Sequence, residues 1–297
     1  MFETSIARTT ALTAFDAVTS EAEDFGHIVS KSPKSKVQCS SCALRHICMA
    51  SALDEKEVAR LSGVVLNWRA VRQGQALYRT GDPFHSVYAL RSGSFKTVLS
   101  HQSGREYVSG FFLPGETLGV DGIATEQHIC DAVALEDSAV CVIPFHLLEA
   151  LCREVKPLQL HVHKMLSAEI VRETGQRMLL GNLTAEQRVA AYLLDISARF
   201  ERRGYSATDF TLRMTREEIG SYLGLTLETV SRTLSRFQQE GMIRVHGKQI
   251  TLCDLEALDA RWGQAKATVS ARLACAQTHA ATSTRFDWGT ASNEAPC

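Results

Sequence analysis

Residues 215–245 read TREEIGSYLGLTLETVSRTLSRFQQEGMIRV, and this stretch decides the fold of the second half of the chain. Thr215 and Glu218 form a T-x-x-E capping box, which is typical of a helix start. Gly224 ends this short helix, and Thr226 is placed to cap a second one. A helix, a short turn and a second helix are the arrangement that lays its second helix into the major groove of DNA.

The exposed face of the predicted second helix carries side chains that can read base edges. Glu228, Ser231 and Arg232 lie in its first two turns, where such helices contact bases. Arginine can donate two hydrogen bonds to guanine, glutamate can accept one from cytosine, and serine can serve either partner. After the helix, 242–245 and 249–252 predict a two-stranded wing. Residues suited to phosphate contacts lie around this face: Arg216, Thr229, Ser235, Arg236 and Lys248.

Upstream, residues 64–145 have the pattern of a β domain. Short runs of alternating or β-branched residues are separated by glycines, and this spacing favours a sandwich or a small barrel. The clearest expected strands are 86–90, 95–99, 107–111 and 139–143.

A single long helix is predicted between these two parts. Pro157 suits the first helical position, and no further proline follows before about residue 180. Leu166, Ile170 and Glu173 fall on one face at spacings of four and three, as in a heptad seam. This face is either the edge of a core helix or a homodimer seam, in which two Glu173 side chains would repel and make assembly conditional.

The N-terminal part contains a second constellation, three cysteines within ten residues. The spacing Cys39-x2-Cys42-x5-Cys48 lets one loop wrap a metal ion or an iron–sulfur cluster. Closed sites of either kind favour four ligands, and the spacing leaves the choice between zinc and iron–sulfur open. The candidates for a fourth ligand are Cys130, Cys141, Cys152, Cys253 and His46.

Composition narrows the class of protein. The 297 residues carry 32 basic and 33 acidic side chains, with 45% hydrophobic and 22% charged residues, as in ordinary soluble domains. Wholesale disorder and a membrane-spanning run of about 20 apolar residues are therefore not expected. The N-terminus lacks the pattern of a secretory signal, so we expect a cytoplasmic, reducing compartment. There, spaced cysteines are more often metal ligands or reactive thiols than disulfide partners.

Several stretches together resemble the CRP/FNR superfamily of transcription regulators and, within it, the FNR branch (fumarate and nitrate reduction regulators). They are CSSCALRHIC (39–48), QGQALYRTGD (73–82), YALRSGSFK (88–96), FLPGETLGVDGI (112–123), VCVIPF (140–145) and MTREEIGSYLGLTLETVSRTLSRFQ (214–238). The resemblance implies an α+β fold with an N-terminal cyclic-nucleotide-binding-like β-roll (jelly roll), a long dimerisation helix and a C-terminal winged helix-turn-helix. Glu228, Ser231 and Arg232 match the FNR readout triplet, whereas the cyclic-AMP receptor branch has glycine in place of Ser231.

The resemblance also implies chemistry that the spacing leaves open. The family's fourth ligand matches Cys141. The implied ligands of a [4Fe–4S] cluster are then Cys39, Cys42, Cys48 and Cys141. The implied protein is a homodimer that binds double-stranded DNA at TTGAT-type palindromes, activates or represses genes, and loses DNA binding when oxygen degrades the cluster. It is not an enzyme. Activation requires a contact with RNA polymerase, for which the hairpin 101–105 is a candidate.

Three alternatives stay open. A dithiol- or ligand-responsive regulator of the same fold would lack an iron–sulfur cluster and be colourless. A cyclic-nucleotide-responsive regulator would need an Arg-Ser/Thr pair where this chain has His128-Ile129. A thiol or iron–sulfur enzyme, with Cys42 or Cys48 as the reactive group and His46 as base, would leave the helix-turn-helix unexplained.

The expected division of the chain follows the same segments. It comprises a mobile leader (1–38), a cysteine loop (39–48), a β-roll sensor domain (49–156), a dimerisation helix (157–182), a winged helix-turn-helix domain (183–262) and a disordered tail (263–297).

Overall fold

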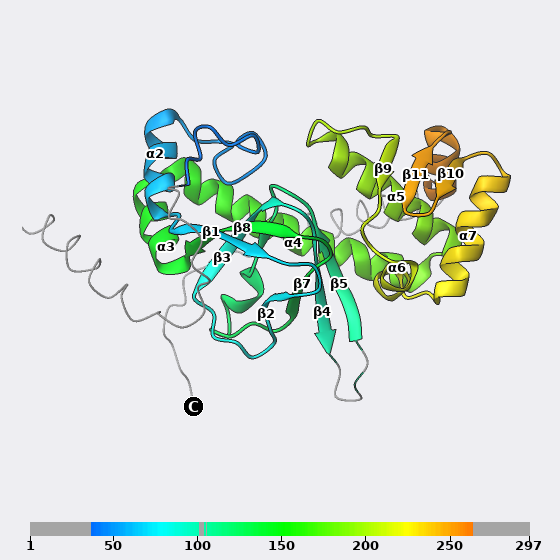
Figure 1. The fold of residues 1–297 in the computed structure, drawn as a ribbon, viewed down its shortest axis with the longest axis horizontal. Coiled ribbons are helices and arrows are strands. Elements are labelled where there is room, and N and C mark those ends of the chain that lie inside the picture. The colour runs from blue at the N-terminus through cyan, green and yellow to red at the C-terminus, as the bar shows by residue number, and fades with distance from the viewer. Residues whose placement is uncertain (1–36, 101–103, 105, 264–297) are drawn as a thin grey trace, which may run out of the picture. The chain divides into compact units, whose positions relative to one another are not determined.

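The computed structural model of the chain describes residues 37–100, 104 and 106–263. These residues form a β-rich part, one long helix and a smaller C-terminal part (Figure 1). Apart from residues 37, 38 and 263, the expected leader and tail lie outside the described residues, as does most of the hairpin 101–105. The expected fold class is confirmed: a cyclic-nucleotide-binding-like β domain, a long helix and a winged helix-turn-helix follow one another along the chain.

The β-rich part of the described chain contains two antiparallel four-stranded sheets. Their strand orders are β1-β8-β3-β6 and β2-β7-β4-β5. Side chains of both sheets form one core, in which Phe95 of β4 and Val140 of β8 are fully buried. The four strands expected from the sequence are β3, β4, β5 and β8. The bounds are β1 Asn67–Val71, β2 Ala76–Tyr78, β3 Ser86–Ser92, β4 Phe95–Ser100, β5 Glu106–Phe112, β6 Thr117–Leu118, η2 Val120–Gly122, β7 Asp131–Ala134 and β8 Ser138–Pro144.

Two helices in this part were not expected from the sequence. α2 (Glu55–Val64) begins at a capping box in which Asp54 and Glu57 each accept a hydrogen bond from the other's backbone N–H. α3 (Phe145–Glu154) follows β8 directly. Both helices share an apolar core with side chains of β3 and β8, and Val37 is buried in the same core. This core supports the cysteine loop, which lies between Val37 and α2.

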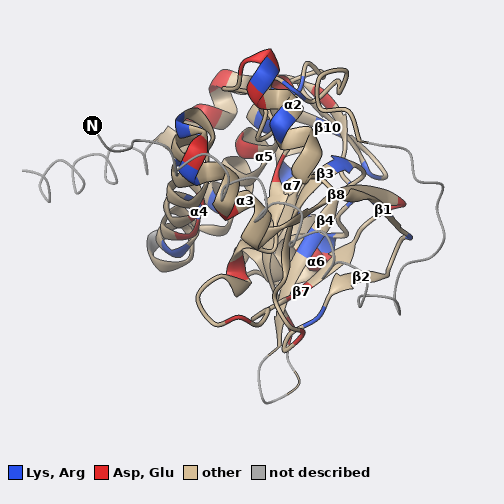
Figure 2. Ribbon diagram, turned by 90° about the vertical axis from the view of Figure 1, so that its left-hand side faces the viewer, with Lys and Arg blue, Asp and Glu red and all other residues tan. Residues whose placement is uncertain are grey.

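The expected long helix is α4 (Lys156–Asn182), and its 27 residues make it about 40 Å long. Its N-terminal turns pack into the same core as α2 and α3 through Leu158, Val162 and Met165. Residues of both charge signs mark the helix (Figure 2). Other apolar side chains of α4 are exposed: Leu160, Ile170, Val171 and Leu180.

The C-terminal part is a winged helix-turn-helix. α6 (Arg216–Leu223) and α7 (Leu227–Gln239) are joined by a short turn, and β10, β11 and β9 form a three-stranded sheet. The expected caps at Thr215 and Thr226 are present, because each accepts a backbone hydrogen bond at the start of α6 and α7. Thr184 caps the start of α5 in the same way. The wing was expected, but β9 was not. The remaining bounds are α5 Ala185–Glu201, β9 Asp209–Thr211, β10 Ile243–His246 and β11 Gln249–Leu252.

The turn between α6 and α7 depends on two glycines. A Cβ added at Gly220 would come within 2.7 Å of the Leu225 carbonyl oxygen, closer than real Cβ atoms approach. Gly224 ends α6 with a φ of +62°, in the left-handed region that glycine adopts most easily. These glycines permit the short connection that sets α7 against α6.

Candidate metal centre and nucleic-acid interface

The cysteine loop is a run of turns anchored to α2. The Cys48 N–H donates to the Leu44 carbonyl oxygen at 2.9 Å, which curls the second half of the loop. The Cys39 N–H donates to the hydroxyl oxygen of Ser62 in α2 at 3.2 Å. Met49, directly after the loop, is 2% exposed and belongs to the core beneath it. The loop is therefore held by α2 at one end and by the core at the other.

The three loop cysteines and Cys141 line one hollow. Cys141 lies in β8, where its backbone pairs with Trp68 of β1 on one side and Ala89 of β3 on the other. Tertiary folding thus brings four thiols from two distant segments to one place. The lining includes Cys39, Cys42, Cys48, Cys141, Arg45 and Arg91.

The other candidate ligands lie elsewhere, and none of them lines the hollow. Cys130 is buried in the β domain, with its sulfur 3.5 Å from Oδ2 of Asp121. Cys152 is buried in α3. Cys253 and His46 are exposed. The structure therefore places Cys141, and not the rivals that sequence spacing left open, beside the loop.

Burial raises the pKa of three thiols that line the hollow. Loss of solvation is the main cause, and it raises the pKa of Cys48 to about 11 and that of Cys141 to about 12. The pKa of Cys39 is also raised by burial, against the opposing effects of the Ser62 hydroxyl and the Arg91 guanidinium. Protonated thiols of this kind are weak nucleophiles, and metal binding would have to displace their protons.

The donor set fits an iron–sulfur cluster. Four cysteines are the ligands that [4Fe–4S] clusters use. Among the described residues, no group of three or more His, Cys, Asp or Glu side chains is placed to hold a single metal ion. All four cysteines lie in the lining of one hollow, as the ligands of a shared cluster must.

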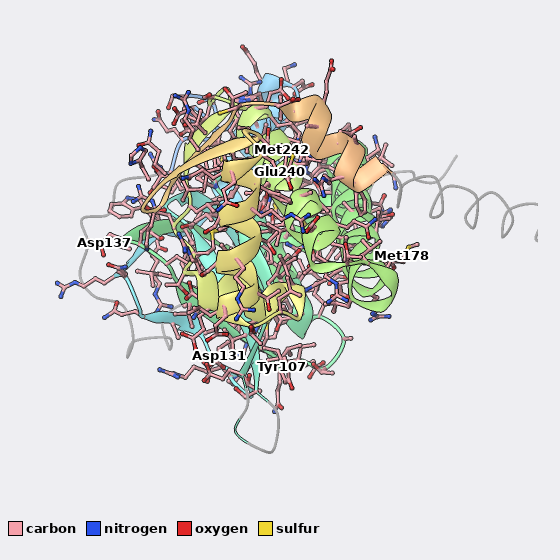
Figure 3. The ribbon with its side chains drawn as sticks, turned by 90° about the vertical axis from the view of Figure 1, so that its right-hand side faces the viewer. Tyr107, Asp131, Asp137, Met178, Glu240 and Met242 are labelled. Carbon is pink, nitrogen blue, oxygen red and sulfur yellow. The ribbon has the colours of Figure 1, made fainter. Side chains whose placement is uncertain are left out.

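α7 presents the expected base-reading side chains on its outer side. Figure 3 looks onto this helix, which ends beside the labelled Glu240. Glu228 and Arg232 are exposed, and Ser231 is half-buried. The opposite side of the helix is buried through Val230, Thr233, Leu234 and Phe237. The polar face is therefore free of the protein core.

Two of the expected phosphate-binding cations lie around this face. Arg216, at the start of α6, donates from Nη1 to the Ser231 hydroxyl at 3.3 Å. Lys248, in the wing, donates from Nζ to the Arg213 carbonyl oxygen at 3.0 Å and stays exposed. Thr229 is half-buried, and its N–H donates to the Thr226 hydroxyl, so Thr229 takes part in the cap of α7.

Arg236 is already engaged by acidic side chains. It pairs with Glu186 of α5 and, at 3.0 Å, with Glu240 at the end of α7. Arg261 pairs with the same two carboxylates. A phosphate contact by Arg236 would have to compete with this network, whereas Ser235 is exposed.

The expected dimer seam lies open in the single chain. Ile170 is 65% exposed, and Leu166 is half-buried. Glu173 is exposed and lies 3.7 Å from Arg177 one turn further on. Val171, the next residue, is 67% exposed, so two large apolar side chains in the middle of α4 are uncovered in the single chain.

The position that a cyclic nucleotide would require is filled differently. His128 is 2% exposed, its ring stacks on Tyr78 with centroids 3.7 Å apart, and its Nδ1 lies 3.3 Å from Oδ1 of Asp121. Ile129 is 53% exposed. Neither residue offers phosphate the paired donors of an arginine.

Comparison with known proteins agrees with this arrangement. Residues 68–155 match the cyclic nucleotide-binding domain family, and 187–261 match the Crp-like helix-turn-helix domain family. The "Transcriptional regulatory protein btr" of Bordetella pertussis is 45% identical over 226 residues, covering 76% of this chain and 93% of that protein. The "Fumarate and nitrate reduction regulatory protein" of Salmonella typhimurium is 39% identical over 230 residues, covering 77% and 92%. FixK2 from Bradyrhizobium japonicum is structurally similar, with a TM-score of 0.61, 30% identity and coverage of 65% and 96%.

A cyclic-nucleotide-binding-type domain joined to a winged helix-turn-helix defines a DNA-binding transcription regulator rather than an enzyme. The chain belongs to the CRP/FNR family and, within it, to the FNR branch. In the part of the chain that the structure describes, no helix is both long enough and apolar enough to cross a bilayer.

Proposed function

We propose that this chain is an oxygen-responsive regulator of anaerobic metabolism in which four cysteines hold a [4Fe–4S] cluster. The observation that carries the proposal is that Cys141 of β8 lines the same hollow as the three cysteines of the loop. When bound, the cluster supplies a group that oxygen can attack. The proposed ligands are Cys39, Cys42, Cys48 and Cys141.

The chain's own residues prepare this site. Apolar side chains such as Val37 and Ile143 form part of the wall of the hollow and limit contact with water. Arg45 and Arg91 lie in the same wall, where their positive charges offset the negative charges of ionised thiolates.

The loop is linked to the dimer helix through a common core. Met49, next to Cys48, shares that core with Leu158 and Met165 of α4. A rearranged loop therefore disturbs the packing under α4. Glu173 adds a charge to the seam around Ile170 and so weakens the dimer. A change of about 1.4 kcal/mol in dimer stability shifts the dimer equilibrium tenfold.

DNA binding depends on that dimer. The sensor domain (49–156) and the DNA-binding domain (183–262) are present twice in a homodimer, which presents two copies of α7 to the two halves of a palindrome. Glu228, Ser231 and Arg232 read TTGAT half-sites in this proposal. A monomer retains one half-site contact and loses the gain from linked binding. The hairpin 101–105, between β4 and β5, is proposed to contact RNA polymerase.

The test starts with anaerobic purification of the full chain, followed by its visible spectrum, iron and sulfide content, and binding to a TTGAT–ATCAA duplex before and after air. We expect a brown protein with about four irons per chain, which bleaches in air as DNA binding falls.

Variants separate the ligand sets. Cys141→Ala should abolish the colour, whereas Cys130→Ala should keep it. A colourless protein that binds DNA equally with and without air would contradict the proposal. That outcome would favour a dithiol- or ligand-responsive regulator of the same fold.

A further inference from the structure

Glu116, in the loop between β5 and β6, binds two arginines of the DNA-binding domain. Arg199 in α5 donates from Nε to Oε1 at 3.1 Å and from Nη2 to Oε2 at 2.6 Å. Arg203, just after α5, donates from Nη2 to Oε1 at 2.5 Å. Two donors on one guanidinium fix direction as well as distance. The carboxylate is therefore a directional joint between the two domains.

This ion-pair group is largely shielded from water. The side chains of Arg199 and Arg203 are 7% and 4% exposed, and that of Glu116 is 26% exposed. Burial opposes ionisation of the carboxyl, but the two guanidiniums outweigh it and lower the pKa of Glu116. Both arginines make further bonds to this segment, since Arg199 donates to the Phe111 carbonyl oxygen in β5 (2.6 Å) and Arg203 donates to that of Pro114 in the loop (2.7 Å). Breaking such a group by removing one charge leaves the others buried and unpaired.

The residue before Glu116 touches the cysteine loop. A Cβ added at Gly115 would lie 2.7 Å from Cδ1 of Ile47, the neighbour of Cys48. The loop between β5 and β6 is also bonded to β3. The Gly115 N–H donates to the Leu90 carbonyl oxygen (2.7 Å), and the Leu90 N–H donates to the Glu116 carbonyl oxygen (2.8 Å). Both chain neighbours of Leu90 line the cysteine hollow. One short turn thus contacts the cysteine site on one side and α5 on the other.

We propose that Glu116 is a positioning residue that transmits the state of the cysteine site to the DNA-binding domain within a single chain. A displaced Ile47 shifts the turn at Gly115, and Glu116 carries the shift to α5. Because α5 and α7 belong to one apolar core, α7, which carries the base-reading side chains, moves with α5. This route adds to dimerisation. The nature of the signal rests on the proposed function, but the contact of Glu116 with Arg199 and Arg203 does not depend on that function.

The first test uses Glu116→Gln in the full chain, which keeps the size of the side chain and removes its charge. Affinity is measured for a duplex with a single half-site, where dimer avidity plays no part, with the cluster present and after its removal. We expect iron content and dimer fraction to be unchanged, and the ratio of the two affinities to fall about tenfold. Glu149→Gln is the matched control, since Glu149 is exposed and pairs with Arg153 in the same helix. It should leave the ratio unchanged.

A second variant and a second readout keep the test decisive. Ile47→Ala should lower the same ratio from the other end of the route while the Glu116 ion pairs stay intact. Where Glu116→Gln alone folds poorly, the double variant with Arg203→Gln leaves one buried guanidinium, that of Arg199, which keeps Asp195 as an ion-pair partner at 3.3 Å. Calorimetry of the cluster-free protein should show one unfolding transition for wild type and two for Glu116→Gln.

The outcomes separate the two proposals. A Glu116→Gln protein with an unchanged affinity ratio and a single transition would overturn the coupling while leaving the cluster proposal intact. A protein that never binds iron would overturn the cluster proposal. In that case calorimetry and the half-site affinity of Glu116→Gln still decide whether the joint positions the DNA-binding domain.

Discussion

Lys96 of β4 donates from Nζ to Oε1 of Glu218 in α6 at 2.7 Å, while the other oxygen of Glu218 accepts the Thr215 N–H at 2.6 Å. One carboxylate thereby joins the β domain to the cap of the helix that precedes the reading helix. β5 lies beside α6 (Figure 1), and the Val108 N–H donates to the Ser221 hydroxyl at 3.0 Å. Together with Glu116, these contacts make the orientation of the helix-turn-helix dependent on the β domain.

The Lys96–Glu218 pair should make stability depend on pH. Burial opposes ionisation, but hydrogen bonds from Lys96 and the Thr215 N–H outweigh it and lower the pKa of Glu218 below its ordinary value of 4.5. A pKa that is lower in the folded state stabilises the fold above about pH 4.5, and this contribution is lost as pH falls through the folded-state pKa. Glu218→Gln should therefore lower the free energy of unfolding by about 1 kcal/mol at pH 7. Urea unfolding should show the difference from wild type shrinking towards pH 3; a constant difference would contradict the assignment.

Gly220→Ala should destabilise the helix-turn-helix. The added methyl group would lie 2.7 Å from the Leu225 carbonyl oxygen, so the turn has to open. We expect a loss of about 1–3 kcal/mol in the free energy of unfolding. Gly63→Ala is the control, because a Cβ there meets nothing within 4 Å. Equal thermal shifts in both variants would show that the turn is not tight.

Tyr192→Phe should stabilise the protein. Among the described residues, the Tyr192 hydroxyl is buried without a hydrogen-bond partner, in a core that includes the rings of Phe111 and Tyr222. Removing a desolvated, unpaired hydroxyl should raise the free energy of unfolding by about 1 kcal/mol. Tyr78→Phe provides the contrast, because its hydroxyl is bonded to Asp121 at 3.2 Å and its loss should destabilise. A Tyr192→Phe variant that melts earlier than wild type would refute the prediction.

DNA variants should separate base reading from phosphate binding. Arg232→Ala should cost about 1–3 kcal/mol on the preferred site and relax the choice of base at one position of each half-site. Lys248→Ala should weaken binding to all sequences and reduce the salt slope by about 1. Fluorescence anisotropy on a set of single-base site variants at several salt concentrations distinguishes the two patterns. If Arg232→Ala weakened binding to all site variants equally, Arg232 would not be one of the base-reading residues.

Changes in the seam should shift assembly in opposite directions. Ile170→Asp adds a charge to the exposed apolar face and should weaken the dimer more than tenfold, which corresponds to about 1.4 kcal/mol. Glu173→Ala removes a repelling charge, so the dimer should persist, and DNA binding with it, after exposure to air. Sedimentation velocity with and without oxygen measures both. An air-exposed Glu173→Ala protein that remains monomeric would show that Glu173 does not limit assembly.

Local signals predicted much of the fold. The caps at Thr215 and Thr226 depend on contacts between residues three apart, so their spacing alone placed α6 and α7. The Asp54–Glu57 box gave the same signal for α2, yet the surrounding residues lack a strong apolar period and the helix was missed. β9 was missed because a three-residue strand is defined by its partner β11 and carries no pattern of its own.

The sequence by itself determined the helix-turn-helix, the long helix α4 and the group of three cysteines, because each depends on residues within a few positions of one another. Spacing left Cys130 and Cys141 open, the resemblance to the FNR branch implied Cys141, and the tertiary structure lines the hollow with Cys141. Only the tertiary structure joined Glu116 to Arg199. Strand pairing and helix docking bring distant segments together, and spacing along the chain does not record which side chain of a strand faces which neighbour.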